Sequence, residues 1–117
     1  MHIEEYREYC ISKKGVTEEF PFDNRTLVFK VMGKMFALTD VDDFESINLK
    51  TDPDIGEELR AQFTAIQPGY HMNKRLWITV ATRGDVGDVK IRQLIDASYY
   101  LVLAGLPKRV REELDKQ

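Results

Sequence analysis

Apolar side chains recur at helical spacing near the start of the chain, at Ile3, Tyr6 and Cys10. Lysines close this stretch and Gly15 follows them, an order typical of a helix C-terminus because glycine readily adopts the left-handed conformation. The pattern predicts a helix over residues 2–14.

The spacing changes after the segment Phe20-Pro21-Phe22-Asp23-Asn24, which predicts a turn because proline fixes φ and Asp-Asn tolerates turn geometry. Leu27–Val31 and Met35–Thr39 are rich in apolar and aromatic residues, as strands are. The short loop between them predicts a β-hairpin with Gly33 and Lys34 at its tip.

The middle of the chain predicts one more strand and a helix. Ser46–Lys50 alternates strictly between polar and apolar residues, which indicates a half-buried strand. Asp52 followed by Pro53 is typical of a helix start. Ile55, Leu59 and Phe63 then form the expected core-facing stripe of a helix over residues 53–63.

The last part of the chain predicts a strand and two helices. Residues 75–81 alternate again, with Leu76, Ile78 and Val80 expected to face the core. A long apolar helix follows from Val89 and ends at Gly105, and Pro107 begins a short charged helix.

This order of elements predicts an α+β fold. The strands are linked mainly by tight turns, which favours a mostly antiparallel sheet with helices packed on one face and the other face left open. Period-two alternation assigns seven side chains to the open face: Lys30, Ser46, Asn48, Lys50, Arg75, Trp77 and Thr79.

Composition favours a single soluble domain over residues 1–117. Hydrophobic residues make up 43% of the 117 residues and charged residues 32%, a globular balance. The start of the chain is polar, and no apolar run is long enough for a membrane span. Cys10 is the only cysteine, so it is expected to be a small core residue without a disulfide. We therefore expect a cytoplasmic monomer with no membrane partner.

Charge is distributed unevenly along the chain. The net charge is −3, which by itself argues against nucleic acid as a partner. Residues 24–39 and 65–83, however, contain lysine and arginine but no acid, whereas residues 40–58 are strongly acidic. A fold that brings the two acid-free stretches together would form a local cationic surface.

No metal, cofactor or catalytic motif is recognisable. His2 and His71 are far apart in sequence, which does not suit a zinc site. The acids from Asp40 to Glu45 resemble the start of a calcium loop but lack its glycine and its final acid, so a solvated turn is expected. Ser98 is expected to pack within its helix.

Two residues leave alternatives open. Histidine as a residue type can act as a general base near neutral pH, so His71 is a candidate for that role. Its neighbours Asn73, Lys74 and Arg75 suit contact with an anion instead, and a capped loop histidine is equally compatible with the pattern. Trp77 fits a core position, or, if exposed, a platform on which a base could stack.

Several segments together resemble the MmcQ/YjbR family. They are Phe20-Pro21-Phe22, residues 27–31, residues 33–38, Ile47-Asn48-Leu49-Lys50 with Asp52-Pro53, residues 68–74 leading to Trp77, Leu94-Ile95-Asp96, and Ser98-Tyr99. The resemblance implies a frataxin-like (CyaY-like) two-layer α+β sandwich. It also implies a "double wing" role in which β-hairpins approach DNA.

The resemblance points to the Gly33-Lys34 tip, to Lys50 and to the loop from Tyr70 to Lys74. With the neighbouring cations, the candidate DNA-binding residues are Lys30, Lys34, Lys50, His71, Asn73, Lys74, Arg75 and Trp77. The leading hypothesis is a non-enzymatic domain that binds the DNA backbone weakly, without strong sequence specificity.

Two alternatives remain. One is a protein–protein interaction module that uses the acidic 40–58 segment or the open sheet face. The other is a small-ligand or enzyme site near His71, with Asn73 and Tyr70.

Overall fold

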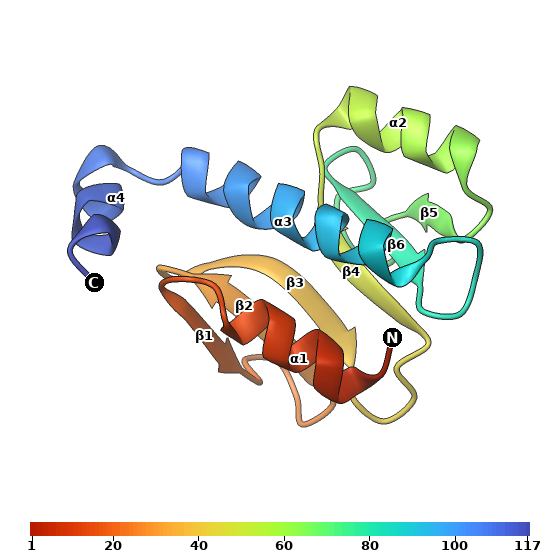
Figure 1. The fold of residues 1–117 in the computed structure, drawn as a ribbon, viewed down its shortest axis with the longest axis horizontal. Coiled ribbons are helices and arrows are strands. Elements are labelled where there is room, and N and C mark those ends of the chain that lie inside the picture. The colour runs from red at the N-terminus through yellow and green to blue at the C-terminus, as the bar shows by residue number, and fades with distance from the viewer.

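A computed structural model describes residues 1–117 as one six-stranded sheet with four helices (Figure 1). Every strand pair is antiparallel, and the strand order is β1-β2-β3-β4-β6-β5. In chain order the elements are α1 (Ile3–Ile11), β1 (Val16–Glu19), β2 (Thr26–Val31), β3 (Lys34–Asp40), β4 (Ser46–Lys50), α2 (Pro53–Gln62), β5 (Ile66–Pro68), β6 (Trp77–Ala81), α3 (Asp88–Ala104) and α4 (Lys108–Asp115).

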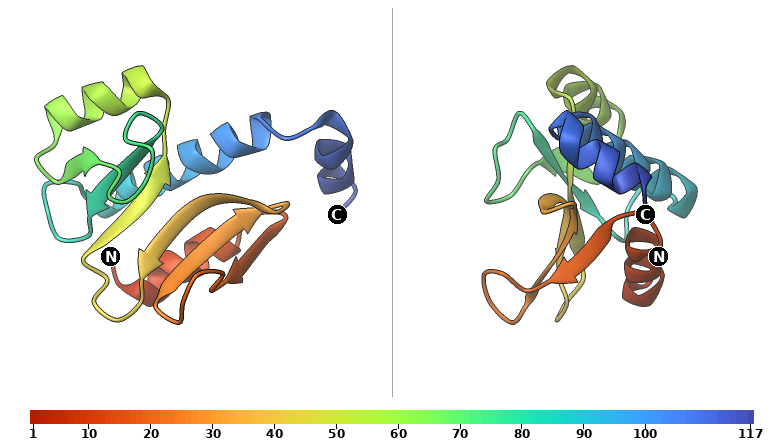
Figure 2. Two further views of the ribbon diagram at one scale, coloured as in Figure 1. Left: turned by 180° about the vertical axis from the view of Figure 1, so that it is seen from behind. Right: turned by 90° about the vertical axis from the view of Figure 1, so that its left-hand side faces the viewer.

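The helices pack on one side of the sheet, as the sequence predicts. α1 and α3 lie against the same face, and the opposite face carries no helix (Figure 2). Side chains from all four helices enter one core with the strands, among them Tyr6, Leu59, Ile95 and Leu114. The fold is therefore α+β, with an antiparallel sheet. None of its helices combines the length and the apolar character needed to cross a membrane.

Two loops project from the helix-free face (Figure 2, right). One is the connection between β1 and β2, residues 20–25, and the other is the connection between β5 and β6, residues 69–76. They leave part of the sheet accessible between them, and they flank the candidate site described below.

Cys10 and Tyr6 form the buried stripe of α1, as its periodicity predicts. Both side chains are completely buried, and Tyr6 packs edge-on against Phe29 of the sheet. Burial raises the pKa of the Cys10 thiol to about 12, so the thiol stays protonated at neutral pH and behaves as a small core residue.

The helix starts follow the sequence signals, whereas some ends and faces differ. The Asp52 carboxylate accepts hydrogen bonds from the backbone N–H groups of Asp54 and Ile55, as an N-cap does. α1 ends at Ile11, earlier than predicted, and Gly15 lies beyond it with a φ of 75°. The prediction for Ile55 is wrong: it is 53% exposed, because Gly56 and Leu59 face the core instead.

Two short strands at the sheet edges, β1 and β5, were not predicted from the sequence. β1 contains two glutamates in four residues and pairs only with β2, and β5 has three residues and ends in proline. Neither segment is long enough to show a period of two. Their pairing with a neighbouring strand, rather than their own pattern, defines them.

Candidate functional site

The candidate site begins where β3 and β4 separate at one end of the sheet. Phe29 pairs with Ala37 and Lys30 pairs with Met35, so Phe36 is an extra residue in β3, a β-bulge. Pairing between β3 and β4 covers only three residue pairs, from Ala37–Leu49 to Thr39–Ile47. Because a bulge bends its strand, β3 diverges from β4 on the side of Ala37 that leads back to Lys34.

Ser98 of α3 bridges this separation. Its side chain is completely buried, and its hydroxyl donates a hydrogen bond to the Phe36 carbonyl at 2.5 Å and accepts one from the Lys50 N–H at 2.8 Å. The prediction that Ser98 packs within its helix is therefore wrong. The hydroxyl satisfies two backbone groups that the shortened ladder leaves unpaired, and it fixes the backbone of Lys50 at the opening.

A groove of about 470 Å³ lies at this opening. The cations that line it are Lys30, Lys34 and Lys50, and the sequence predicts all three as site residues. Its remaining lining includes Phe22, Met35 and Trp77, together with Leu101 near the C-terminal end of α3 and Leu106 just after that helix. None of the twelve lining residues is Asp or Glu. We call this feature the lysine groove. It joins both acid-free stretches, since residues 30–35 come from one and Trp77 from the other.

The three lysines of the groove differ in their partners. Lys30 forms an ion pair with Glu19 at 2.5 Å, so an acid from the unpredicted strand β1 offsets its charge. Lys34 at the hairpin tip is exposed, Lys50 at the end of β4 is half-buried, and neither forms an ion pair. Lys34 and Lys50 are therefore the groove cations that are free to bind an anion.

Trp77 lines the groove but is not an exposed platform. It lies on the helix-free face, as predicted, opposite Lys50. It is only 8% exposed because it packs with Val28 and Leu38 in a small apolar cluster on that face. The exposure on which a stacking role depends is absent, so the core interpretation of Trp77 is correct.

The strand that contains Trp77 starts later than predicted. β6 begins at Trp77, and Arg75 and Leu76 lie in the preceding turn. Arg75 is exposed there rather than on a strand, and Leu76 is 38% exposed rather than part of the core. Arg75 forms no ion pair and remains a free cation beside the open face.

The 69–76 loop adjoins the groove through Gly69. A Cβ atom on Gly69 would lie 2.7 Å from Cβ of Trp77, so only glycine allows the loop to pass this close. The Lys74 ammonium donates a hydrogen bond to the Gly69 carbonyl at 3.3 Å, which leaves its other two donors available. Lys74 and Arg75 therefore extend the cationic surface outward from the groove.

His71 and Asn73 have different roles in this loop. Asn73 Oδ1 accepts hydrogen bonds from the N–H groups of Arg75 at 3.0 Å and Leu76 at 3.2 Å, so the Asn73 oxygen holds the turn. His71 is exposed, has a φ of 58° and packs against the Tyr70 ring at 4.0 Å between centroids. No carboxylate bonds to its imidazole to orient it, which an efficient general base usually requires.

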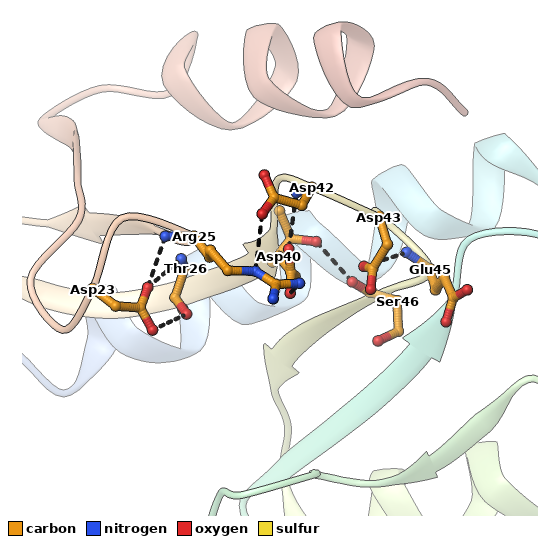
Figure 3. A network of polar contacts seen from close by, with 9 residues as sticks. Asp23, Arg25, Thr26, Asp40, Asp42, Asp43, Glu45 and Ser46 are labelled. Carbon is orange, nitrogen blue, oxygen red and sulfur yellow. Dashed lines mark hydrogen bonds and ion pairs between the residues drawn. The ribbon is translucent and has the colours of Figure 1, made fainter.

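The acids of residues 40–45 lie at the opposite end of β3 from Lys34. Figure 3 shows that these acids contact each other's backbone and Arg25. The Arg25 guanidinium pairs with Asp40 at 2.7 Å and with Asp42 at 3.0 Å. The hydrogen bond from the Asp42 N–H, together with Arg25, lowers the pKa of Asp40. Arg25 belongs to an acid-free stretch of sequence, but these partners remove it from the cationic surface.

The rest of the acidic 40–58 segment lies elsewhere. Asp52 caps α2, and Glu57 and Glu58 are exposed on that helix. The segment therefore does not form one acidic patch. No three His, Cys, Asp or Glu side chains come close enough together to hold a metal ion.

The sequence did not identify three features of the groove. The pattern predicts helix packing for Ser98 and a turn for Phe22, and it does not single out Leu101 within the long apolar helix. Phe22 is 66% exposed and Leu101 38% exposed, and both line the groove. The Phe20-Pro21-Phe22 motif was the available signal for Phe22, since exposed aromatic residues beside a proline turn need a reason other than the core.

Comparison with known proteins gives consistent matches across the chain. A family model described as YjbR matches residues 11–101. The uncharacterized protein YjbR of Escherichia coli K12 is 35% identical over 115 residues, which cover 97% of this chain and 98% of that protein. The uncharacterized protein YbdF of E. coli O157:H7 is 40% identical over 91 residues, 77% of this chain and 75% of that protein.

Solved structures share the fold. The crystal structure of Deinococcus radiodurans protein DR2400, a DUF419 domain, matches with a TM-score of 0.90 and 41% identity, over 97% of this chain and 87% of that one. A crystal structure of a Pseudomonas syringae protein matches with a TM-score of 0.74 and 29% identity, over 86% of this chain and 98% of that one.

Proposed function

This chain belongs to the YjbR family, and from that premise we propose that it is a non-enzymatic DNA-binding domain that holds the phosphate backbone on the lysine groove and the 69–76 loop. The observation that carries the proposal is the groove itself, which is lined by three lysines and by no acid in a protein whose net charge is −3. Phosphate binding is mainly electrostatic, so a local surface of this kind matters more than the total charge.

Four cations make up the proposed contact surface. Lys34 and Lys50 belong to the groove, and Lys74 and Arg75 extend it along the loop. None of the four is paired with a carboxylate, so binding a phosphate breaks no existing ion pair. Lys30 contributes less to phosphate binding, because its ammonium must first give up its ion pair with Glu19.

The arrangement of loops supports contact from the helix-free side. Pro21 and Phe22 of the 20–25 loop line the groove with Gly33 and Lys34 of the hairpin, and the 69–76 loop adjoins it through Gly69. The 20–25 and 69–76 loops project from the face that carries no helix (Figure 2). The hairpin and these two loops are the elements to which a double-wing mode of binding would assign the DNA contacts. Backbone contacts position DNA but carry no sequence information, which is consistent with weak sequence preference.

The proposal is tested by removing the free lysines together. The variant Lys34→Ala/Lys50→Ala/Lys74→Ala is expected to lose most of its affinity for a labelled duplex, at least tenfold at low salt, because each lost phosphate contact also removes a released counterion. Fluorescence anisotropy of a short labelled duplex measures the affinity.

A matched control removes the same charge elsewhere. The variant Arg83→Ala/Lys90→Ala/Arg92→Ala changes cations of the β6–α3 loop and the start of α3, whereas the groove contacts the other end of that helix. It is expected to bind within about twofold of the wild type. If both triple variants lose affinity equally, net charge rather than the groove determines binding, and the proposed surface is wrong.

A further inference from the structure

The lysine groove has an apolar side that phosphate contact alone does not require. Phe22 is 66% exposed and Leu101 38% exposed, and both line the groove with Lys34 and Lys50. Large apolar side chains exposed next to unpaired cations indicate a ligand that has both an anionic and a flat apolar part. A nucleotide with an unpaired base is such a ligand.

We infer that the groove accepts an unpaired nucleotide, so that the protein binds single-stranded nucleic acid in preference to duplex. This inference rests on the proposed function and specifies its ligand. In this mode the phosphates lie against Lys34 and Lys50, and a base lies against Phe22 and the apolar end of α3.

The dimensions of the groove agree with this assignment. Its volume of about 470 Å³ falls within the range of pockets that hold ligands of nucleotide size. The groove forms where β3 and β4 diverge. The Ser98 hydroxyl fixes the two strands at this point through its hydrogen bonds to the Phe36 carbonyl and the Lys50 N–H. The opening is therefore part of the fold rather than a gap between mobile side chains.

The exposed aromatic ring distinguishes a single strand from a duplex. Proteins that bind single strands combine a cationic groove with aromatic side chains on which bases stack. In a duplex the bases are already paired and stacked, so Phe22 would meet only sugar and phosphate. Trp77 cannot replace Phe22 as the platform, since it is buried against Val28 and Leu38.

Phe20 provides a matched control for Phe22. It lies in the same loop, is 48% exposed and lines a different cavity, between α1 and the sheet, with Ile3 and Val41. Phe20→Ala and Phe22→Ala thus remove the same ring from the same loop, one outside the lysine groove and one inside it.

The experiment compares a labelled single strand of about 12 nucleotides with the duplex of the same sequence, at one salt concentration, by fluorescence anisotropy. The single strand is expected to bind at least tenfold more tightly. Phe22→Ala should weaken single-strand binding by about tenfold and duplex binding by much less, whereas Phe20→Ala should weaken single-strand binding by less than about twofold. Fluorescence of Trp77, the only tryptophan, should respond to the single strand because its ring lines the groove.

The outcomes separate this inference from the proposed function. Equal or tighter binding of the duplex overturns the preference for single strands but leaves the DNA-binding proposal intact. The same holds if Phe22→Ala and Phe20→Ala behave alike on the single strand. If neither nucleic acid binds, the proposed function fails, and this inference fails with it.

Discussion

Ser98 links β3 to β4 where the two strands diverge at the candidate site. Its hydroxyl joins the Phe36 carbonyl to the Lys50 N–H in a completely buried position. Sequence periodicity could not show this, because both partners lie far away in the chain and a serine on an apolar helix stripe resembles ordinary small-residue packing. The sequence shows that a serine lies on this helix. It does not show the bulge in β3, which leaves the backbone groups that the serine hydroxyl binds.

Ser98→Ala is expected to lower the free energy of unfolding by about 2 kcal/mol, because it leaves the buried Phe36 C=O and the partly buried Lys50 N–H without a partner. Urea unfolding followed by Trp77 fluorescence measures the change. Ser12→Ala is the control, since the Ser12 hydroxyl is exposed and bonds only to the Tyr9 carbonyl. A loss for Ser98→Ala no larger than for Ser12→Ala would show that the bridge contributes nothing to stability.

Individual charged residues show why the candidate set was only partly predictable. Lys34 and Lys50 line the same groove, whereas Arg25 and Lys30 are paired with acids. The partner of Lys30, Glu19, lies on a strand that the sequence pattern does not reveal. Whether a cation is free depends on such contacts, and residue order alone does not specify them.

At the scale of elements, the β2–β3 hairpin was predicted, but its turn is Met32-Gly33, and Lys34 begins β3 rather than lying in the turn. Met32 and Gly33 have positive φ angles of 48° and 87°, the conformation of a two-residue turn that matches the twist of the strands. The tip positions Lys34 directly after the turn, so its geometry sets where this cation meets the groove.

Gly33→Ala is expected to destabilise the fold by about 1 kcal/mol because alanine disfavours the left-handed conformation. A Cβ atom at this position has no neighbour within 4 Å, so the cost is conformational rather than steric. Gly33→Asn should recover most of the loss, since asparagine tolerates this conformation. Chemical denaturation of the three proteins measures the order of stability, and equal stability of the alanine and glycine forms would contradict the turn assignment.

Long elements were predictable and irregular ones were not. β4 alternates between half-buried and buried residues as its sequence does, and α3 buries Ile91, Leu94 and Ile95 as its apolar spacing predicts. β2 and β3 were predicted from their apolar and aromatic composition, and each buries residues on both faces. The short edge strands, the bulge at Phe36 and the late start of β6 depend on pairing between strands. The groove arises from the irregular features, and for this reason its lysines were predicted but its shape was not.

At the scale of the whole molecule, the fold separates charges of opposite sign. The acids from Asp40 to Glu45 lie at one end of β3, and Lys34 lies at the other. Strands rise by about 3.3 Å per residue, so the length of β3 exceeds the Debye length of about 8 Å at physiological salt. The acidic end therefore repels a phosphate at the groove only weakly, although the protein is acidic overall.

The most direct test of DNA binding at the lysine groove is the salt dependence of duplex affinity. Four unpaired cations predict a slope of roughly −3 to −4 for log affinity against log salt, at about 0.9 per phosphate contact. Removal of Lys34, Lys50 and Lys74 should bring the slope to about −1. Binding of the DNA backbone at this surface would be contradicted if the duplex affinity did not change between low and moderate salt. It would also be contradicted if the triple variant kept the full salt slope.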